Sequence, residues 1–108
     1  MPTHFGDGRD WFFERRFGLF VHWGLYAIPA WHEQHQYRLN IPRREYEQLI
    51  HRFNPVRFDP DAWLDLAEEV GMRYICFTTK HHDGFCMFDT KYTDYKITSP
   101  ECPFHSNP

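Results

Sequence analysis

Two short apolar runs, each followed at once by polar and aromatic residues, dominate the hydrophobic pattern of this chain. The first covers residues 17–21 and leads into His22-Trp23-Gly24. The second covers residues 74–79 and leads into Lys80-His81-His82-Asp83-Gly84-Phe85. Short apolar runs that end at glycine and polar residues are typical of buried strands. We therefore predict one strand over about residues 17–22 and another over about residues 73–80.

Two helices are predicted between these strands. Residues 43–53 form the first, because proline at position 42 suits a first turn and an Asn-Pro pair at 54–55 ends it. Residues 60–70 form the second, with Asp59 as its N-cap and Gly71 closing its C-terminus. Its apolar stripe has helical spacing and consists of Trp63, Leu66, Ala67 and Val70. Residues 25–42 show no regular period and are predicted to be a loop.

The order strand, helices, strand defines a βαβ unit of the α/β class, whose two strands run parallel with a right-handed crossover. Parallel strands are normally covered on both faces, so Cys76 in the second strand is expected to be a small core residue. Two strands alone leave two edges unpaired and are marginally stable. The chain is therefore expected either to belong to a longer polypeptide or to complete its sheet by self-association.

Composition and charge exclude some classes of function. Hydrophobic residues make up 42% and aromatic residues 19% of the chain, which favours a folded protein. The net charge of −3 and the lack of a basic stripe argue against a nucleic-acid partner, and no apolar run is long enough for a membrane span. The N-terminus lacks the apolar core of a signal peptide, which favours a cytoplasmic protein or a secreted one without its leader. Three cysteines without a C-x-x-C pair are expected to be reduced thiols.

The candidate chemistry lies where the predicted strands end. Carboxyl ends of neighbouring parallel strands meet at one edge of a sheet, so His22 is expected near His81 and His82. Imidazoles beside the carboxylate of Asp83 suit hydrogen bonding to a polyhydroxylated ligand. The alternative is structural, with Asp83 capping the turn before Gly84 and the histidines satisfied locally.

A metal centre and a cofactor are not expected. Adjacent residues of an extended strand point to opposite faces, so His81 and His82 do not chelate one ion without a kink. The segment His32-Glu33-Gln34-His35 lacks the spacing of the zinc-protease motif. Glu33, in the loop after the first strand, either reaches the histidine pocket or is simply solvated. Four aromatic residues of this region either form walls for a sugar or pack as ordinary loop residues: Trp23, Tyr26, Trp31 and Tyr37.

These motifs together resemble the α-L-fucosidases of glycoside hydrolase family 29. The resemblance covers residues 11–100 and rests on Trp11-Phe12, Arg16–Gly24, Leu25–Ala30, Phe53-Asn54-Pro55, Phe58-Asp59, Ala67–Gly71, Thr79–Phe85 and Asp89–Tyr95. It implies a (β/α)8-type barrel, of which residues 1–108 form a single truncated piece with two strands. It also implies that His22, His81 and His82 bind the fucose hydroxyls and that Glu33 lies near the sugar. Trp23 is a further candidate for binding the sugar, because of its place directly after the first strand. Gln34 replaces a tryptophan that is frequent in the family.

The resemblance implies retaining hydrolysis, which uses a nucleophile and an acid/base carboxylate about 5–5.5 Å apart. The family carries both on later strands, so its nucleophile is expected to be absent from this chain. Our first hypothesis is a homo-oligomeric fucosidase that acts on a fucosylated glycan or aryl fucoside, with Glu33 and Asp83 as the catalytic candidates. The alternatives are a non-catalytic fucose-binding module and an inert fragment of a larger fucosidase.

Overall fold

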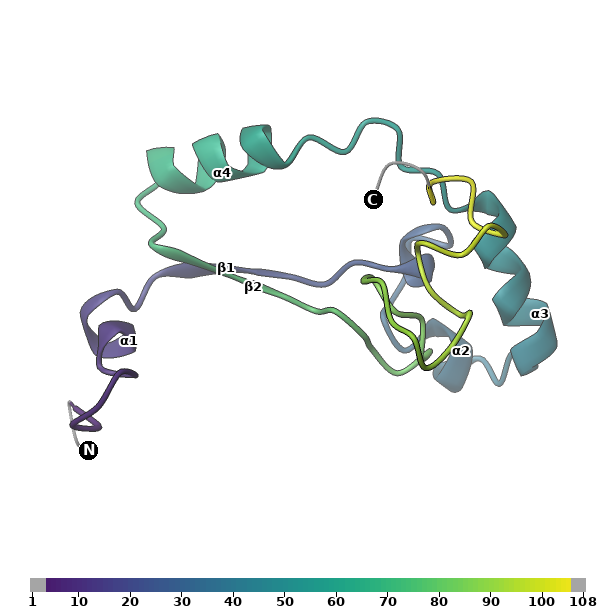
Figure 1. Ribbon diagram of the computed structural model, residues 1–108, viewed down its shortest axis with the longest axis horizontal. Helices are drawn as coiled ribbons and strands as arrows, with labels where there is room; N and C mark the ends of the chain where they lie inside the picture. The colour runs from purple at the N-terminus through teal and green to yellow at the C-terminus, as the bar shows by residue number, and fades with distance from the viewer. Residues whose placement is uncertain (1–3, 106–108) are drawn as a thin grey trace. The chain divides into compact units, whose positions relative to one another are not determined.

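The computed structural model describes residues 4–105, so both ends of the expected 1–108 domain lie outside the described part (Figure 1). The chain divides into two compact units. The first contains the residues up to Val21 together with Asp59–Cys76, and the second contains His22–Phe58 together with the residues from Phe77 onward.

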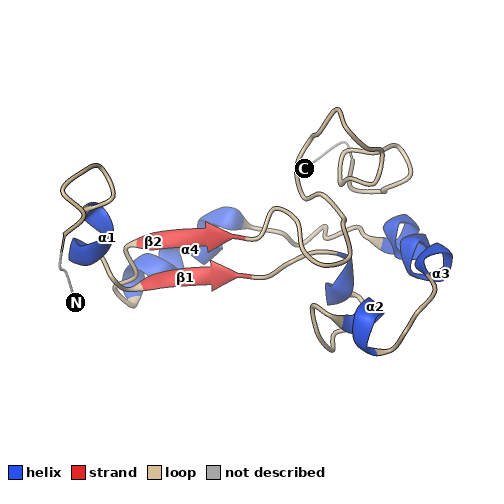
Figure 2. Ribbon diagram, turned by 90° about the horizontal axis from the view of Figure 1, so that it is seen from below, coloured by secondary structure: helices blue, strands red, loops and turns tan. Residues whose placement is uncertain are grey.

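The first unit carries the sheet. Strand β1 (Gly18–Val21) pairs with β2 (Tyr74–Phe77), and the two arrows point the same way in Figure 2. The backbone amide of Arg73 donates to the carbonyl of Phe17 at 2.7 Å, which fixes the start of the pairing. The predicted pair of parallel strands in an α/β arrangement is thus confirmed. Strand β2 is shorter than the predicted 73–80, because Lys80 forms an isolated bridge with Cys86 instead.

Helix α4 (Pro60–Glu69) lies along the two strands (Figures 1 and 2). The Asp59 carboxylate accepts the backbone amide of Ala62 at 3.1 Å, so the first turn has a side-chain cap. Gly71, at φ 90°, turns the chain out of the helix, and the amide of Met72 returns to the Ala67 carbonyl at 2.8 Å. A short helix α1 (Trp11–Glu14) precedes β1, and the Trp11 ring meets the edge of Tyr74.

The expectation of a buried sheet is wrong for this unit. Cys76 is exposed, and Phe20 of β1 keeps 61% of its surface accessible. On α4 only Ala67 of the apolar stripe is buried, whereas Leu66 is 61% exposed. The physical reason is that the described residues supply two strands and one long helix, which is too little to cover both faces of a parallel sheet.

Gly18 fits closely against Tyr74, and this contact gives a testable prediction. A Cβ at Gly18 would overlap the Tyr74 ring, so Gly18→Ala should lower the free energy of unfolding by about 1–3 kcal/mol. Gly8→Ala is the matched control, because a Cβ there meets no atom within 4 Å. Urea denaturation of the two variants checks the difference. Equal stability of both would show that the ring moves aside without cost.

The second unit holds the hydrophobic core. Its helical elements are η1 (Leu25–Ala27), α2 (His35–Arg38), α3 (Arg43–Glu47) and η2 (Gln48–Arg52). Eight buried residues form one cluster: Leu25, Tyr46, Ile50, Phe53, Phe85, Ile97, Cys102 and Phe104. Cys102 also donates its thiol to the carbonyl of Phe53 at 3.3 Å. The core therefore combines residues that precede, form and follow the predicted helix 43–53.

Three local features of this unit differ from the sequence expectation. The predicted loop 25–42 contains the short elements η1 and α2. The predicted helix 43–53 is α-helical only through Glu47 and then tightens into the 3₁₀ turn η2, a common way for a helix to end. Residues 89–105, whose sequence pattern predicts loop, supply Ile97 and Phe104 to the core. Within residues 4–105 no helix has the length and apolar character needed to cross a membrane.

Candidate functional site

Three histidines from distant parts of the sequence meet in the second unit. His22 directly follows β1, whereas His81 and His82 lie a few residues beyond the end of β2. The rings of His22 and His81 are 5.2 Å apart between centroids, and those of His81 and His82 are 4.5 Å apart. Tyr26 of η1 presents its ring edge to His81 at 5.8 Å. The imidazoles therefore form one continuous cluster with an aromatic wall.

The hydrogen bonds assign which ring nitrogens carry protons. The backbone amide of His82 donates to Nδ1 of His81 at 2.9 Å, so the His81 proton lies on Nε2 in the neutral ring. Arg38 Nε donates to the Gln34 side-chain oxygen at 2.9 Å, which turns the Gln34 amide nitrogen toward Nε2 of His82 at 3.4 Å. His82 Nε2 is consequently an acceptor. The cluster thus offers a donor at His81 and a paired acceptor at His82.

Burial and like charges favour the neutral form of His81. Desolvation lowers the pKa of His81 most, and the neighbouring imidazoles of His82 and His22 lower it further. Glu33 and Asp83 oppose this effect. A neutral ring both donates and accepts, which suits recognition of sugar hydroxyls at neutral pH.

Glu33 is an ionised carboxylate beside the imidazoles. A backbone hydrogen bond lowers the pKa of Glu33 most, and the charges of His32, His81 and His22 act in the same direction. Its Oε2 lies 3.3 Å from Nδ1 of His32. That nitrogen accepts the backbone amide of Gln34 at 2.9 Å, so in the neutral ring it does not donate to Glu33. Apart from its own backbone hydrogen bond, the Glu33 carboxylate keeps lone pairs that can accept from a ligand.

Two hydrogen bonds within the second unit hold the Asp83 carboxylate in place. The Tyr46 hydroxyl of α3 donates to Asp83 Oδ2 at 2.7 Å, and the backbone amide of Phe85 donates to Oδ1 at 3.1 Å. Burial raises the pKa of Asp83, and the Tyr46 hydrogen bond partly offsets that rise. This carboxylate ties the turn that carries His81 and His82 to α3. Nothing in the sequence around Tyr46 marks a partner 37 residues away, so this hydrogen bond has no signal in the sequence.

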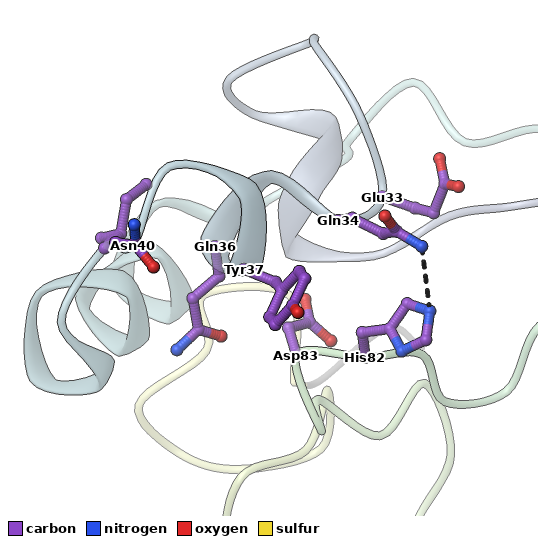
Figure 3. A pocket seen from close by; sticks show the side chains of 8 residues that line it. Glu33, Gln34, Gln36, Tyr37, Asn40, His82 and Asp83 are labelled. Carbon is purple, nitrogen blue, oxygen red and sulfur yellow. Dashed lines mark hydrogen bonds between the residues drawn. The ribbon is translucent and has the colours of Figure 1, made fainter.

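A pocket of about 410 Å³ opens beside His82 (Figure 3). Eight residues line it: Glu33, Gln34, Gln36, Tyr37, Asn40, Ile41, His82 and Asp83. In Figure 3 the Glu33 carboxylate points away from Asp83, so the two side chains do not converge. Neither His22 nor His81 lines this pocket.

The structure places Trp23 against the hydrophobic core. Its indole packs against Phe53 at 5.7 Å and Phe58 at 5.1 Å, next to the hydrophobic core. Trp23 therefore anchors the segment after β1, and Tyr26 takes the place beside His81. Among residues 4–105 no group of three or more His, Cys, Asp or Glu side chains is arranged to hold a metal ion.

Comparison with known proteins places this arrangement in a family. The alpha-L-fucosidase family model matches residues 6–106. Tissue alpha-L-fucosidase of Bos taurus is 36% identical over 91 residues, which cover 69% of this chain and 19% of the relative. Plasma alpha-L-fucosidase of Homo sapiens is 28% identical over 99 residues, which cover 77% of this chain and 21% of the relative.

Solved structures agree. The GH29 alpha-L-fucosidase of Bacteroides thetaiotaomicron superposes with a TM-score of 0.85 at 34% identity, covering 97% of this chain and 26% of that protein. Alpha-L-fucosidase isoenzyme 1 of Paenibacillus thiaminolyticus gives 0.79 at 49% identity, covering 87% and 23%. The chain thus superposes on part of the fold of solved alpha-L-fucosidases. The chain belongs to the alpha-L-fucosidase family, and it spans about a fifth of the length of the curated relatives that it matches.

Proposed function

We propose that this chain forms the fucose-binding part of an α-L-fucosidase that removes terminal α-L-fucosyl groups from a fucosylated glycan or aryl fucoside. The observation that carries the proposal is the contact of His22, His81 and His82 beside the ionised Glu33. Fucose presents neighbouring hydroxyls that both donate and accept hydrogen bonds. Neutral imidazoles and a carboxylate supply the complementary set.

The geometry supports a separate role for each of these residues. His81 donates from Nε2 to one hydroxyl, and Glu33 accepts from another. Tyr26, which is only 6% exposed, packs against His81 and supports the position of its ring. Trp23 supports the position of His22 from the core side. No cofactor or metal takes part in this proposal.

Hydrolysis with retention needs a nucleophile and an acid/base carboxylate about 5–5.5 Å apart. Retention is supported by the trapped covalent intermediate described for the Bacteroides thetaiotaomicron relative, because retaining enzymes pass through a glycosyl-enzyme. Glu33 and Asp83 are the candidates in this chain. They point apart in Figure 3, so we propose that each works with a carboxylate of another copy.

Self-association is the second half of the proposal. The sheet of the first unit contains β1 and β2 alone, so within residues 4–105 each strand has an outer edge without a strand partner. An apolar groove of about 470 Å³ lies between α4 and β1, and Leu66 and Val70 on its rim are more than half exposed. A second copy of the chain offers the same edges and the same apolar side chains. Residues 1–108 would then act as one piece of a barrel that several copies complete.

A non-catalytic fucose-binding module is the second candidate. It is favoured by the occupied oxygens of Asp83, which already accept hydrogen bonds from Tyr46 and Phe85. In this case fucose binds to the histidine cluster without turnover.

An aryl-fucoside assay on a fraction of known light-scattering mass distinguishes these functions. We expect an oligomer that releases the aryl group, with Glu33→Gln or Asp83→Asn lowering kcat by about 10²–10⁴-fold. Glu101→Gln, at an exposed glutamate outside the site, is the control. Binding of fucose by an inactive chain would favour the binding module. If fucose causes no thermal shift and no turnover occurs, the proposed function is wrong.

A further inference from the structure

His82 depends on its neighbours for the orientation of its ring. It lies on an exposed stretch of chain beyond β2, where packing does not fix a side chain. Its Nε2 lies 3.4 Å from the side-chain nitrogen of Gln34 (Figure 3). Its ring also meets that of His81 edge to face at 4.5 Å. What Gln34 presents to His82 therefore determines how this imidazole faces a ligand.

Arg38 determines which end of the Gln34 amide faces His82. A guanidinium only donates hydrogen bonds, and Arg38 Nε lies 2.9 Å from the side-chain oxygen of Gln34. The oxygen must therefore face Arg38, which leaves the amino group for His82. Gln34 directly precedes α2 and Arg38 ends it, so the two residues lie four apart on one face. The backbone amide of Arg38 also donates to the Gln34 carbonyl at 2.8 Å, so Arg38 holds Gln34 by both backbone and side chain.

The orientation of Gln34 sets the tautomer of His82. The amino group of Gln34 donates, so Nε2 of the neutral His82 ring accepts and its proton lies on Nδ1. Among residues 4–105 no group accepts a hydrogen bond from that Nδ1, so it is available to a ligand. His81 carries its proton on the opposite nitrogen, because its Nδ1 accepts the backbone amide of His82. The two neighbouring imidazoles thus each present one donor.

We infer that Arg38 is a positioning residue that acts through Gln34, and that the two together hold His82 in the tautomer that donates from Nδ1 to an oxygen of the ligand. The identity of that ligand rests on the proposed fucose site. Arg38 does not line the pocket beside His82 and needs no contact with the sugar. Gln34 stands where tryptophan is frequent in the family, and an indole, which only donates, could not accept from Arg38.

Nitrogen-15 NMR of the imidazole rings in the full chain, at a pH where they are neutral, tests the tautomer. His82→Asn identifies the His82 signals by their loss, and the wild type should carry the proton on Nδ1. Gln34→Glu offers only acceptors, so the proton should move to Nε2, a reversal that a loss of packing would not produce. Arg38→Ala frees the Gln34 amide to turn, so both tautomers should be populated. Arg38→Lys restores a donor to the Gln34 oxygen and should recover the wild-type pattern.

Isothermal titration with L-fucose tests the consequence for binding. Arg38→Ala and Gln34→Leu should each weaken binding about threefold to tenfold, because His82 then donates in only part of the molecules. The double variant should bind no more weakly than Gln34→Leu alone, since Arg38 acts through Gln34. Arg44→Ala is the control. It removes the same charge from an exposed arginine of α3 and should change neither the tautomer nor the binding.

The outcomes separate this inference from the proposed function. If the His82 proton stays on Nδ1 in both Gln34→Glu and Arg38→Ala, the inference is wrong and the fucose site stands. It is also wrong if the tautomer changes while every variant binds fucose as the wild type does. If the wild type does not bind fucose, the proposed function fails, and the tautomer alone decides whether Arg38 positions His82.

Discussion

Phe85→Ala should cost about 3–5 kcal/mol of the free energy of unfolding, the largest effect we expect from a single truncation. Phe85 is 1% exposed and lies in the middle of the core of the second unit. Its ring meets the edges of Phe53 at 5.9 Å and Tyr95 at 5.2 Å. Alanine would leave a cavity that these neighbours, held by their own contacts, fill only in part.

The same substitution should disturb the candidate site. The backbone amide of Phe85 donates to Asp83, so movement of this segment is transmitted to the turn that carries His81 and His82. Urea denaturation with Tyr92→Ala as the control measures the stability effect, because Tyr92 is 98% exposed. A loss below 1 kcal/mol for Phe85→Ala would show that the core described here does not determine the stability of the chain.

Two parts of the fold follow from sequence patterns because the causes are local. Asp59 and Gly71 mark the ends of α4 through capping geometry, which depends on a few neighbouring residues. The two apolar runs locate the parallel strands in the same way. The core was not predictable by these means. Its members Leu25, Ile97 and Phe104 come from short turns with no hydrophobic period, so only the folded chain shows that they meet.

The same distinction between predictable features and features that only the folded chain shows applies to the candidate site. The meeting of His22 with His81 could be expected, because strand topology brings the carboxyl ends of parallel strands to one edge. The hydrogen bond of Tyr46 to Asp83 could not, since it joins α3 to a turn far along the chain. Trp23 shows that the position of a residue in the sequence does not determine where its side chain packs. It follows the strand directly, yet its ring packs on the core side.

Tyr46→Phe should destabilise the chain by about 1.5–3 kcal/mol at pH 7, because it removes a hydrogen bond to an ionised, partly buried carboxylate. Tyr46 is 2% exposed and its hydroxyl donates to Asp83 at 2.7 Å. Phenylalanine keeps the ring in the core, so the loss reports on the hydroxyl alone. Chemical denaturation at several pH values measures it.

Tyr95→Phe is the matched control. The Tyr95 hydroxyl is also buried, but it makes no hydrogen bond with any described residue. Its ring packs on Phe85 at 5.2 Å, and phenylalanine preserves that contact. Removing an unpaired buried hydroxyl should leave stability unchanged or raise it. Equal losses for Tyr46→Phe and Tyr95→Phe would contradict a specific role of the hydrogen bond to Asp83.

The pH dependence distinguishes this hydrogen bond from simple packing. Burial raises the folded-state pKa of Asp83 above 3.8, so the ionised carboxylate costs stability once the pH rises through that folded value. The Tyr46 hydroxyl reduces this cost, and Tyr46→Phe should therefore raise the pKa of Asp83 further. The difference between wild type and Tyr46→Phe is then largest at neutral pH. It should shrink to about 1 kcal/mol below the unfolded value, where Asp83 is protonated in both states and the hydroxyl contributes only a neutral hydrogen bond. A loss that stays constant across this pH range would show that Tyr46 stabilises the chain by packing. The hydrogen bond to Asp83 would then not be what anchors the turn with His81 and His82 to α3.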